Sequence, residues 1–354
     1  MRNIKVGVLT FHRCINYGSY WQARALAEGL KSRGCDAVIL DHQCRRTTRA
    51  EWRNAFQPTL PQRTPRGDYV GYAAKTRGFL QAFAALPLSQ PFPMDDPGAM
   101  EPCDAVLVGS DEVWNFSHPW YAAQPLFFGE GLRAKRVVAY AASFGCHDSA
   151  TALDEPWAER LRRFSALAVR DDNSRQIVRQ TLGAEPALVL DPCLQFPESV
   201  RRASALADGT DEAVVYGHNF PAALITAVRD WAKARRVRLV SVGYRNDWAD
   251  VQRLDADPEA FAQAMGAARA VITNFFHGCV FALANARPFV CSGTAYRWHK
   301  IASLMDVAQA EDRLVIEGAS DPGIHRLLDT PPASEPALGR LRRRSSAYLD
   351  HALA

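Results

Sequence analysis

Short apolar runs alternate along this chain with longer stretches in which apolar residues recur every three or four positions. Residues 5–10 are predicted to form a strand, and residues 20–33 a helix that would end at Gly34. Residues 37–41 give a second predicted strand. A strand, a helix and another strand in this order form a βαβ unit, so a parallel sheet is expected.

The same alternation continues to the end of the chain. Residues 43–67 are rich in Arg and Pro and lack periodicity, so a loop or an insertion is expected there. Residues 87–102 are rich in proline and are expected to be irregular, and residues 199–211 have the composition of a linker. Further strands are expected at 105–109, 136–141, 166–169, 187–190, 213–216, 238–242, 270–273 and 288–291. Further helices are expected at 69–86, 155–164, 172–182, 222–235, 258–268, 277–286, 297–305 and 337–352.

These elements fall into two α/β series of similar build. The length of 354 residues also suggests two domains. The predicted boundaries are residues 1–198 for the first domain and 212–325 for the second. Residues 326–354 would form a C-terminal helical segment that packs back on the first domain.

Composition narrows the class of protein. The chain is 48% hydrophobic and 23% charged, which is ordinary for a globular protein with a sizeable core. Eight cysteines are scattered without a CxxC pair or Cys/His metal spacing, so buried thiols in a reducing compartment are expected. The net charge of +4 suits anionic small substrates or a loose membrane-surface contact, and is too weak to indicate nucleic acid.

The N-terminus passes directly into a strand, without the apolar core and cleavage site of a signal peptide. No apolar run approaches the length needed to cross a bilayer. A cytoplasmic location is therefore expected.

The segment from Val271 to Leu283 carries the most informative pattern. It is predicted to be a buried strand, a short polar turn with His277 and Gly278, and the start of a helix. Backbone N–H groups at a helix start favour anions, and a histidine there adds a titratable proton. The simpler interpretation is that His277 only caps the helix.

Polar residues also follow the carboxyl ends of other predicted strands. In open α/β sheets ligands bind beyond these ends, so a site in a cleft between the two domains is expected. The residues concerned are His12, Asn16, Tyr17, Gly18, Ser110, Asp111, Arg170, Asp191 and Asn274.

Each of these residues also has a structural interpretation. Asn16 could be part of a plain turn and helix cap, and Ser110 with Asp111 could cap the next helix. Arg170 could pair with a neighbouring aspartate, and Asp191 with its following proline is the typical composition of a turn. Trp114 could stack on a sugar or simply pack in the core.

Three large enzyme classes are disfavoured by missing motifs. The chain has no Walker loop, and no GxGxxG follows its first predicted strand, which argues against P-loop NTPases and ordinary dinucleotide binding. No GxSxG elbow is present, so an α/β-hydrolase is not expected.

The chain resembles the polysaccharide pyruvyl transferases in an ordered set of segments. These extend from the first predicted strand to about Leu314, nearly the whole chain. The matching segments are Thr10-Phe11-His12, Asn16-Tyr17-Gly18, Gln22-Ala23-Arg24-Ala25-Leu26, Val108-Gly109-Ser110-Asp111, Val113-Trp114-Asn115, Tyr140-Ala141-Ala142-Ser143-Phe144-Gly145, Val169-Arg170-Asp171 with Ser174, Leu190-Asp191-Pro192, and Thr273-Asn274-Phe275-Phe276-His277-Gly278 with Phe281.

The resemblance implies two Rossmann-like domains in a glycosyltransferase-B-like arrangement, with the acceptor on the first domain and the donor on the second. It implies transfer of a pyruvyl group from phosphoenolpyruvate to two hydroxyls of a sugar, as a cyclic ketal with release of phosphate, in exopolysaccharide synthesis. The scheme needs no cofactor and no metal. A lipid-linked glycan would bring the enzyme to the inner face of the membrane.

Roles for individual residues follow from that scheme. His277 would protonate the methylene carbon of the donor or assist the departure of phosphate, and Asp111 would accept a proton from the acceptor. Arg170 would bind the anionic donor through its planar guanidinium. The other expected donor ligands are Asn274, Gly278, Arg297 and Lys300. The expected acceptor ligands are His12, Asn16, Tyr17, Gly18, Ser110 and Trp114.

One position departs from the family pattern. Phe275 stands where many family members carry an arginine or a small polar residue, so either other residues hold the anion or a substrate differs. Three alternatives stay open: a glycosyltransferase that uses a nucleotide sugar, an enzyme acting on a small-molecule acceptor through changes in residues 43–67, and a family member without activity.

Overall fold

The computed structural model describes residues 4–59, 61–204, 210–293, 298–315 and 321–354. It divides into two compact units, which are described separately. The first contains Met1–Glu51, Phe83–Phe196 and Gly339–Ala354, and the second contains Trp52–Ala82 and Pro197–Leu338. The boundaries expected from the sequence left residues 52–82 in the first domain, whereas the contacts assign this segment to the second unit.

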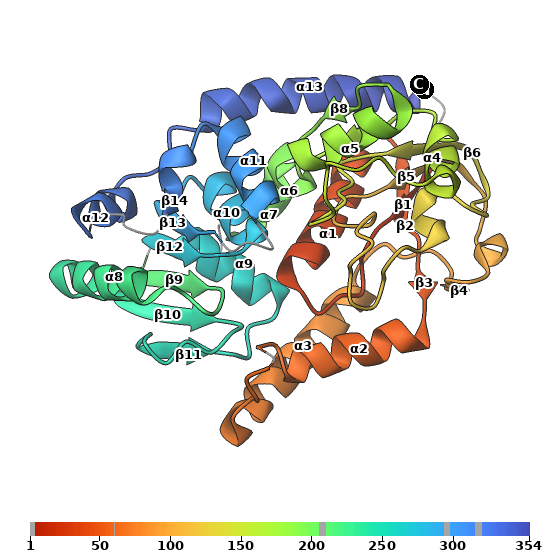
Figure 1. Cartoon of the computed structure of the whole chain (residues 1–354). Helices are drawn as coiled ribbons and strands as arrows, with labels where there is room; N and C mark the ends of the chain where they lie inside the picture. Colours follow the sequence, from red (N-terminus) through yellow and green to blue (C-terminus); the bar gives the residue numbers. More distant parts are fainter. Residues whose placement is uncertain (1–3, 60, 205–209, 294–297, 316–320) are drawn as a thin grey trace. The chain divides into compact units, whose positions relative to one another are not determined.

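The first unit is built on a parallel sheet in the order β2-β1-β5-β6 (Figure 1). Bridges from Val138 to Ala166 and from Ala142 to Val169 extend this sheet toward two short strands, β7 and β8. Its central strands β1 and β5 are almost wholly buried, as expected for a parallel sheet covered on both faces, while the edge strands β2 and β6 are partly exposed. The strands are β1 (Lys5–Leu9), β2 (Asp36–Ile39), β3 (His42–Gln43), β4 (Phe92–Pro93), β5 (Cys103–Val108), β6 (Ala134–Ala139), β7 (Ala168–Val169) and β8 (Ala187–Leu188).

The helices of the first unit begin and end where local chemistry dictates. Asn16 caps α1 by accepting hydrogen bonds from the backbone of Gly18 and Ser19. Asp171 caps α5 in the same way, and Gly183 ends that helix in the left-handed conformation. The helices are α1 (Tyr17–Ser32), η2 (Pro97–Ala99), η3 (Pro125–Phe128), α4 (Glu155–Arg162), α5 (Asp172–Leu182), α6 (Pro192–Gln195) and most of α13 (Glu335–Leu353).

The second unit has a six-stranded parallel sheet in the order β11-β10-β9-β12-β13-β14. In chain order this is 3-2-1-4-5-6, the order of a Rossmann fold. The direction of winding reverses between β9 and β12, where Tyr216 lies beside Thr273. The strands are β9 (Glu212–Tyr216), β10 (Arg238–Val242), β11 (Val251–Arg253), β12 (Ala270–Thr273), β13 (Phe289–Ser292) and β14 (Leu314–Val315).

Helices accompany this sheet as the alternating pattern predicted. Trp231 of α8 is fully buried, with Leu328 of α12, in the core on one side of the sheet. The helices are η1 (Arg66–Asp68), α3 (Tyr69–Ala84), α7 (Pro197–Ser204), α8 (Ala222–Arg235), α9 (Pro258–Ala267), α10 (Phe276–Ala284), α11 (Trp298–Ala308), η4 (Glu311–Arg313) and α12 (Asp321–Asp329). The boundary between the units falls within α2 (Arg45–Phe56).

Two sequence-based expectations were wrong. The expected loop at residues 43–67 contains α2, whose buried stripe is Thr47, Glu51 and Ala55. Two of these three residues are polar, so the helix shows no apolar periodicity. The expected linker contains α7, which packs on α9 so closely that a Cβ on Gly266 would lie 2.1 Å from Ser204 Cβ.

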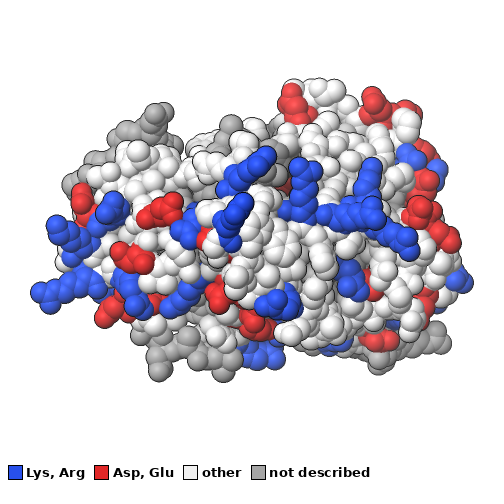
Figure 2. Space-filling view, turned by 90° about the horizontal axis from the view of Figure 1, so that it is seen from below, with Lys and Arg blue, Asp and Glu red and all other residues white. Residues whose placement is uncertain are grey.

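The surface carries both signs of charge. Figure 2 shows basic side chains beside acidic ones on one face, as the small net charge suggests. Among the described residues, no helix combines the length and apolar character that a bilayer crossing requires.

Two helical glycines give a matched test of packing. A Cβ on Gly29 of α1 would lie 2.3 Å from the ring of Phe196, whereas a Cβ on Gly339 of α13 would meet nothing within 4 Å. We expect Gly29→Ala to lower the free energy of unfolding by about 1–3 kcal/mol through overpacking. Gly339→Ala should raise it by about 0.5–1 kcal/mol, because alanine favours a helix over glycine. Urea unfolding of both variants measures the difference, and equal effects would contradict the packing.

Candidate active site

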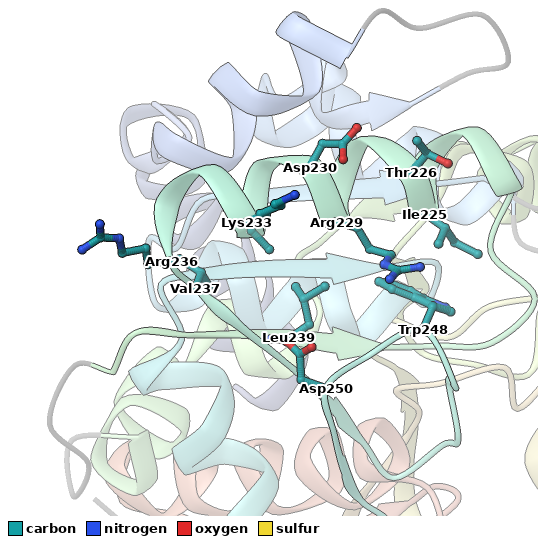
Figure 3. Close-up of a pocket in the computed structure, with 11 residues that line it drawn as sticks. Ile225, Thr226, Arg229, Asp230, Lys233, Arg236, Val237, Leu239, Trp248 and Asp250 are labelled. Atoms are coloured by element: carbon teal, nitrogen blue, oxygen red, sulfur yellow. Dashed lines mark hydrogen bonds between the residues drawn. The ribbon is translucent and has the colours of Figure 1, made fainter.

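One hollow of about 490 Å³ lies on the second unit, beside α8 (Figure 3). Its lining includes Arg229, Lys233, Arg236 and Trp248. It also includes Val237 and Leu239, so it borders the amino-terminal start of β10. Ligands of open α/β sheets bind beyond the carboxyl ends of the strands, so the candidate active site is expected at that edge and not at this hollow.

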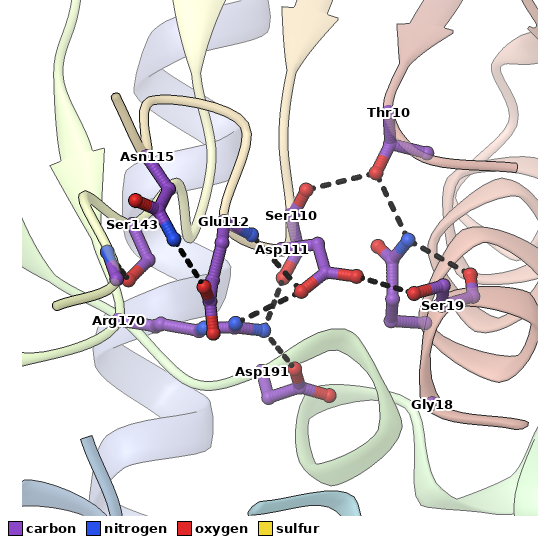
Figure 4. A network of polar contacts seen from close by, with 12 residues as sticks. Thr10, Gly18, Ser19, Ser110, Asp111, Glu112, Asn115, Ser143, Arg170 and Asp191 are labelled. Carbon is purple, nitrogen blue, oxygen red and sulfur yellow. Dashed lines mark hydrogen bonds and ion pairs between the residues drawn. The ribbon is translucent and has the colours of Figure 1, made fainter. Parts of the chain in front are cut away.

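At the carboxyl edge of the first unit, the loops after β1 and β5 are tied together (Figure 4). Thr10 Oγ1 donates to the carbonyl of Ser110 at 2.8 Å, and Gln22 Nε2 donates to Thr10 Oγ1 at 2.9 Å. Ser19 Oγ donates to Asp111 Oδ2 at 2.7 Å. The predicted residues Ser110 and Asp111 therefore lie together with the start of α1.

Arg170, which directly follows β7, joins this network through two carboxylates. Its Nη2 lies 3.1 Å from Asp111 Oδ1, and its Nη1 lies 3.1 Å from Asp191 Oδ2 and 3.4 Å from Ser110 Oγ. Burial would lower the pKa of Arg170, but the charges of Asp111 and Asp191 outweigh it, and the pKa is raised. Both Nη atoms of Arg170 are therefore already engaged with carboxylates.

The backbone that presents Asp111 is unusual. Asp111 has a φ of 79°, and Gly109 before it has a φ of 113°. A Cβ on Gly109 would lie 2.3 Å from the carbonyl oxygen of Tyr140, so only glycine fits at this position. The tight turn aims the Asp111 carboxylate at Ser19 and Arg170.

His12 lies at the same edge in a buried polar cluster. Its Nε2 is 2.9 Å from Asp41 Oδ1, and Arg13 donates to both oxygens of Asp41 at 2.6 and 2.7 Å. Burial would raise the pKa of Asp41, but the hydrogen bonds from Arg13 and His12 hold it well below its ordinary value. His42 bonds the carbonyl of Thr10 at 2.9 Å, and burial together with His12 lowers the pKa of His42 to about 3.

The other predicted acceptor ligands have clear local roles. Asn16 is exposed and caps α1, while Tyr17 and Gly18 are buried in the first turn of that helix. Trp114 is fully buried, and its indole N–H donates to the carbonyl of Phe127 at 2.8 Å. Its ring lies among Phe128, Phe144 and Phe164, so a sugar could not stack on it in this structure.

Glu51 has a buried carboxyl and was missed in the sequence analysis. It lies in α2 and is the last residue of that helix that belongs to the first unit. It accepts hydrogen bonds from Trp120 Nε1 at 2.7 Å and from the backbone N–H of Ile15 at 3.1 Å. Burial raises its pKa, and the charge of Asp111 adds to this. The available signal was that Glu51 is the one acidic residue among residues 45–56.

In the second unit, the loops after β9 and β12 meet at the reversal of strand order. Asn274 is fully buried, and its Nδ2 donates to the carbonyl of His218 at 2.6 Å. Its Oδ1 is buried and has no hydrogen-bond partner among the described residues. A Cβ on Gly217 would lie 2.2 Å from that oxygen, so glycine is needed beside it.

Helix α10 begins directly after Asn274. Its cap residue is Phe275, whose side chain makes no capping bond, and His277 is the second residue of the helix. A Cβ on Gly278 would lie 2.0 Å from Thr273 Oγ1, an atom that accepts a hydrogen bond from the N–H of Phe275 at 3.1 Å. Asn274, His277 and Gly278 thus share one tight turn at the start of a helix, where anions are favoured.

The ring of Phe275 in this turn packs against those of His218 and Tyr244. It also packs against the ring of Tyr216, with the two ring centres 4.9 Å apart. The centres of His218 and Tyr244 lie 5.5 Å apart, those of Tyr244 and Phe275 lie 5.0 Å apart, and those of His218 and Phe275 lie 5.5 Å apart. His218 and Tyr244 were not among the predicted site residues, because each follows its strand without a recognisable motif. We call His218, Tyr244 and Phe275 the ring cluster.

The last predicted donor ligands lie farther along the chain. Lys300 is partly buried in the first turn of α11, and Arg297 lies outside the described residues. Within the described part of the chain, no group of three His, Cys, Asp or Glu side chains is arranged to hold a metal ion. The eight cysteines are free thiols, five of them buried.

A family model described as polysaccharide pyruvyl transferase matches residues 16–296, most of the chain. The chain belongs to this family. The resemblance drawn from the ordered motifs is thereby confirmed, and the protein is a transferase of this family. Membership implies a polysaccharide or sugar acceptor.

Solved structures match the pyruvyl transferase over its whole length at low identity. A UDP-GlcNAc 2-epimerase from Methanocaldococcus jannaschii is 11% identical, with a TM-score of 0.50 over 98% of this chain and 100% of that one. The Escherichia coli heptosyltransferase WaaC with ADP is 13% identical, with a TM-score of 0.41 over 99% and 100%. At 11% identity the epimerase match shows a similarity of fold alone. The predicted α/β, glycosyltransferase-B-like fold class is confirmed. No curated protein matches the chain.

The charge network around Arg170 should be costly to break. Arg170→Met would leave Asp111 and Asp191 buried without their cation, so we expect the free energy of unfolding at pH 7 to fall by about 3–5 kcal/mol. The loss should shrink near pH 4, where carboxylates take up protons. Arg175→Met is the control, because the Arg175–Glu185 pair is exposed and should contribute less than about 1 kcal/mol. Equal losses in the two variants would refute the network.

The buried His42 should make stability depend on pH. In the unfolded chain His42 titrates near 6.5, and in the folded state burial lowers its pKa to about 3. Between these two pKa values the unfolded state binds more protons than the folded state. The contribution of His42 to the free energy of unfolding is therefore fully present above pH 6.5 and is lost as the pH falls below it. Between pH 7 and pH 5 we expect a loss of about 2 kcal/mol.

His42→Gln, which keeps a donor toward Thr10, should remove that loss. The exposed His351→Gln should leave it unchanged. Guanidinium unfolding at pH 7 and pH 5 measures the difference. A wild-type loss that persists in His42→Gln would assign it to another group.

Proposed function

We propose that this pyruvyl transferase moves the pyruvyl group of phosphoenolpyruvate onto two hydroxyls of a sugar, as a cyclic ketal with release of phosphate. Family membership supports the transfer and the class of acceptor. The observation that carries the donor side is the turn at the start of α10, which brings His277 and the buried Asn274 to the reversal of strand order.

The reaction sets the chemical requirements. Two C–O bonds form at the enol carbon of the donor, and its bond to the phosphate oxygen breaks. Of the two protons lost by the sugar hydroxyls, one ends on the former methylene carbon and the other leaves with the phosphate. The site must therefore supply one acid, one base and a hold on the donor's negative charges.

On the donor side we assign the acid to His277. It would protonate the methylene carbon, or alternatively the departing phosphate. The positive end of α10, whose first turn contains Gly278, would favour the donor's anionic groups. The N–H of Gly278 itself donates to the carbonyl of Phe275 at 3.0 Å. Asn274, Arg297 and Lys300 complete the proposed donor set.

On the acceptor side we assign the base to Asp111. Ser19 and Arg170 hold its carboxylate in one orientation, which suits a group that must meet a particular hydroxyl. Arg170 as a direct donor ligand stays a prediction, since in this structure both of its Nη atoms contact carboxylates. His12, Asn16 and Ser110 remain the proposed surroundings of the acceptor.

The acceptor in this proposal is a glycan of exopolysaccharide synthesis, which could be lipid-linked. The enzyme would then work in the cytoplasm, at the inner face of the membrane for such an acceptor. Transfer from a nucleotide sugar is the competing activity.

Phosphate release decides between these activities. Purified protein with phosphoenolpyruvate and a panel of glycans should release phosphate, and His277→Ala should lower the rate by about 10²–10⁴-fold, the usual contribution of a positioned acid. The exposed His351→Ala should keep the wild-type rate. Normal turnover in His277→Ala would remove the acid assignment, and transfer from nucleotide sugars in place of phosphate release would establish the competing activity.

A further inference from the structure

Lys75 is a buried ammonium group that the scheme above does not use. It lies in α3, within the Trp52–Ala82 part of the second unit, and is 3% exposed. Its Nζ donates to the carbonyl of Gly243 at 3.1 Å and lies 5.1 Å from the ring centre of Tyr244. Burying a charged lysine costs free energy unless polar or charged partners compensate for the lost hydration, so the position of Lys75 requires an explanation.

The position is the carboxyl edge of the second sheet. β10 ends at Val242, so Gly243 and Tyr244 are the first residues beyond it. The neighbouring strands β9 and β12 end at Tyr216 and Thr273, beside the reversal of strand order. Tyr244 belongs to the ring cluster with His218 and Phe275, so Lys75 adjoins the cluster that borders the start of α10.

The rest of α3 is shaped to hold Lys75 at this place. Gly71 and Gly78 lie on the same helix face as Lys75, four residues before it and three after. A Cβ on Gly71 would lie 3.0 Å from Leu254 Cβ, and one on Gly78 would lie 2.5 Å from Asp257 Cβ. These glycines let α3 approach the segment after β11 closely on both sides of Lys75.

An ion pair fixes the start of α3 to the loop after β10. Asp68 accepts two hydrogen bonds from Arg245, each 2.5 Å long. Arg245 directly follows Tyr244, so the pair also fixes the residue whose ring Lys75 faces. The helix, the loop and the ammonium group are therefore held as one piece within the second unit.

We propose that Lys75 supplies a cation that holds one anionic group of the donor at this edge of the second unit. The proposal rests on the proposed function, because that function requires an anionic donor. The proposal also accounts for the aromatic residue Phe275 just before α10. The cation would be supplied by Lys75 of α3, which lies beside Tyr244, whose ring contacts that of Phe275.

The protonation of Lys75 supports this role. Burial lowers its pKa to about 7, so near neutral pH the group gains or loses a proton at little cost. An arriving anion would favour the charged form, and donor binding should then take up a proton. Tyr244 is the titratable group beside Lys75 Nζ. The other charged and titratable groups on α3 and on the segments packed against it include Asp68, Tyr72, His218, Arg245 and Asp257.

The test is calorimetric titration of phosphoenolpyruvate into wild type, Lys75→Met and Lys75→Arg between pH 6 and pH 8. The donor's own titration is common to all proteins, so each variant is compared with wild type at the same pH. Relative to Lys75→Arg, which stays charged, wild type should lose about tenfold in affinity between pH 6 and pH 8. Lys75→Met should bind weakly at both pH values. Two buffers of different ionisation enthalpy at pH 7 should show proton uptake in wild type that Lys75→Met lacks.

The exposed Lys233→Met is the matched control and should behave as wild type. Thermal unfolding of every variant separates lost binding from lost structure. A lysine that only anchors Gly243 would change the melting temperature and leave the affinity and its pH dependence unchanged, which would overturn the inference.

Two outcomes separate this inference from the proposed function. If wild type binds phosphoenolpyruvate and Lys75→Met binds it equally well at every pH, the Lys75 role is wrong and the proposed function stands. If wild type does not bind phosphoenolpyruvate, the same series of variants is titrated with inorganic phosphate and with nucleotide sugars. If either ligand binds in a Lys75-dependent way, the anion site at Lys75 is supported and phosphoenolpyruvate is rejected as the donor. If no anion binds, both the Lys75 role and the proposed function are rejected.

Discussion

Parallel strand pairing is the constraint on which the candidate sites depend. Because all strands of a parallel sheet point the same way, the residues that follow them gather at one edge. Thr10 and Ser110 are separated by 100 positions in the chain and meet because β1 and β5 are neighbours. Asn274 reaches the carbonyl of His218 for the same reason, through the pairing of β12 with β9. The loops need only short polar segments to build a site, since the sheet has already brought them together.

At these sheet edges the protein buries charged side chains of a kind that is rare in an apolar core. Arg170 is buried with Asp111 and Asp191, and the Asp41 carboxylate is buried beside His12 while its partner Arg13 is partly exposed. Such pairs gain little net stability over apolar packing, because desolvation offsets most of their attraction. Their benefit is orientation, since a carboxylate held by three donors has one direction. Glu51 and Lys75 differ, because burial raises the pKa of Glu51 and lowers that of Lys75 to about 7, so burial favours the neutral form of each.

Much of the fold could be predicted from the sequence because its signal is local. The helices Asp172–Leu182 and Ala222–Arg235 and the strands Arg238–Val242 and Ala270–Thr273 have the bounds that periodicity gave them. Helix α2 was missed because Thr47 and Glu51 occupy its buried face. Among candidate residues, those beside strand ends could be proposed, since parallel sheets fix their location. The partners of Arg170 were only half foreseen: a nearby aspartate was considered, but Asp111 lies 59 positions away and Asp191 21 positions away.

Lys75 shows the kind of residue that such reasoning cannot find. It follows no strand, carries no motif and stands in a helix encoded between strands of the first unit. Only the assignment of residues 52–82 to the second unit puts it beside Tyr244. The chain passes between the units four times, after Glu51, Ala82, Phe196 and Leu338. A cut at residues 198–212 would therefore yield a second half without α3, leaving the segment after β10 without Lys75 and without the Asp68 partner of Arg245. The two α/β halves are similar in build, but neither is a continuous stretch of sequence, and the side chains at the edge of the second sheet depend on that interruption.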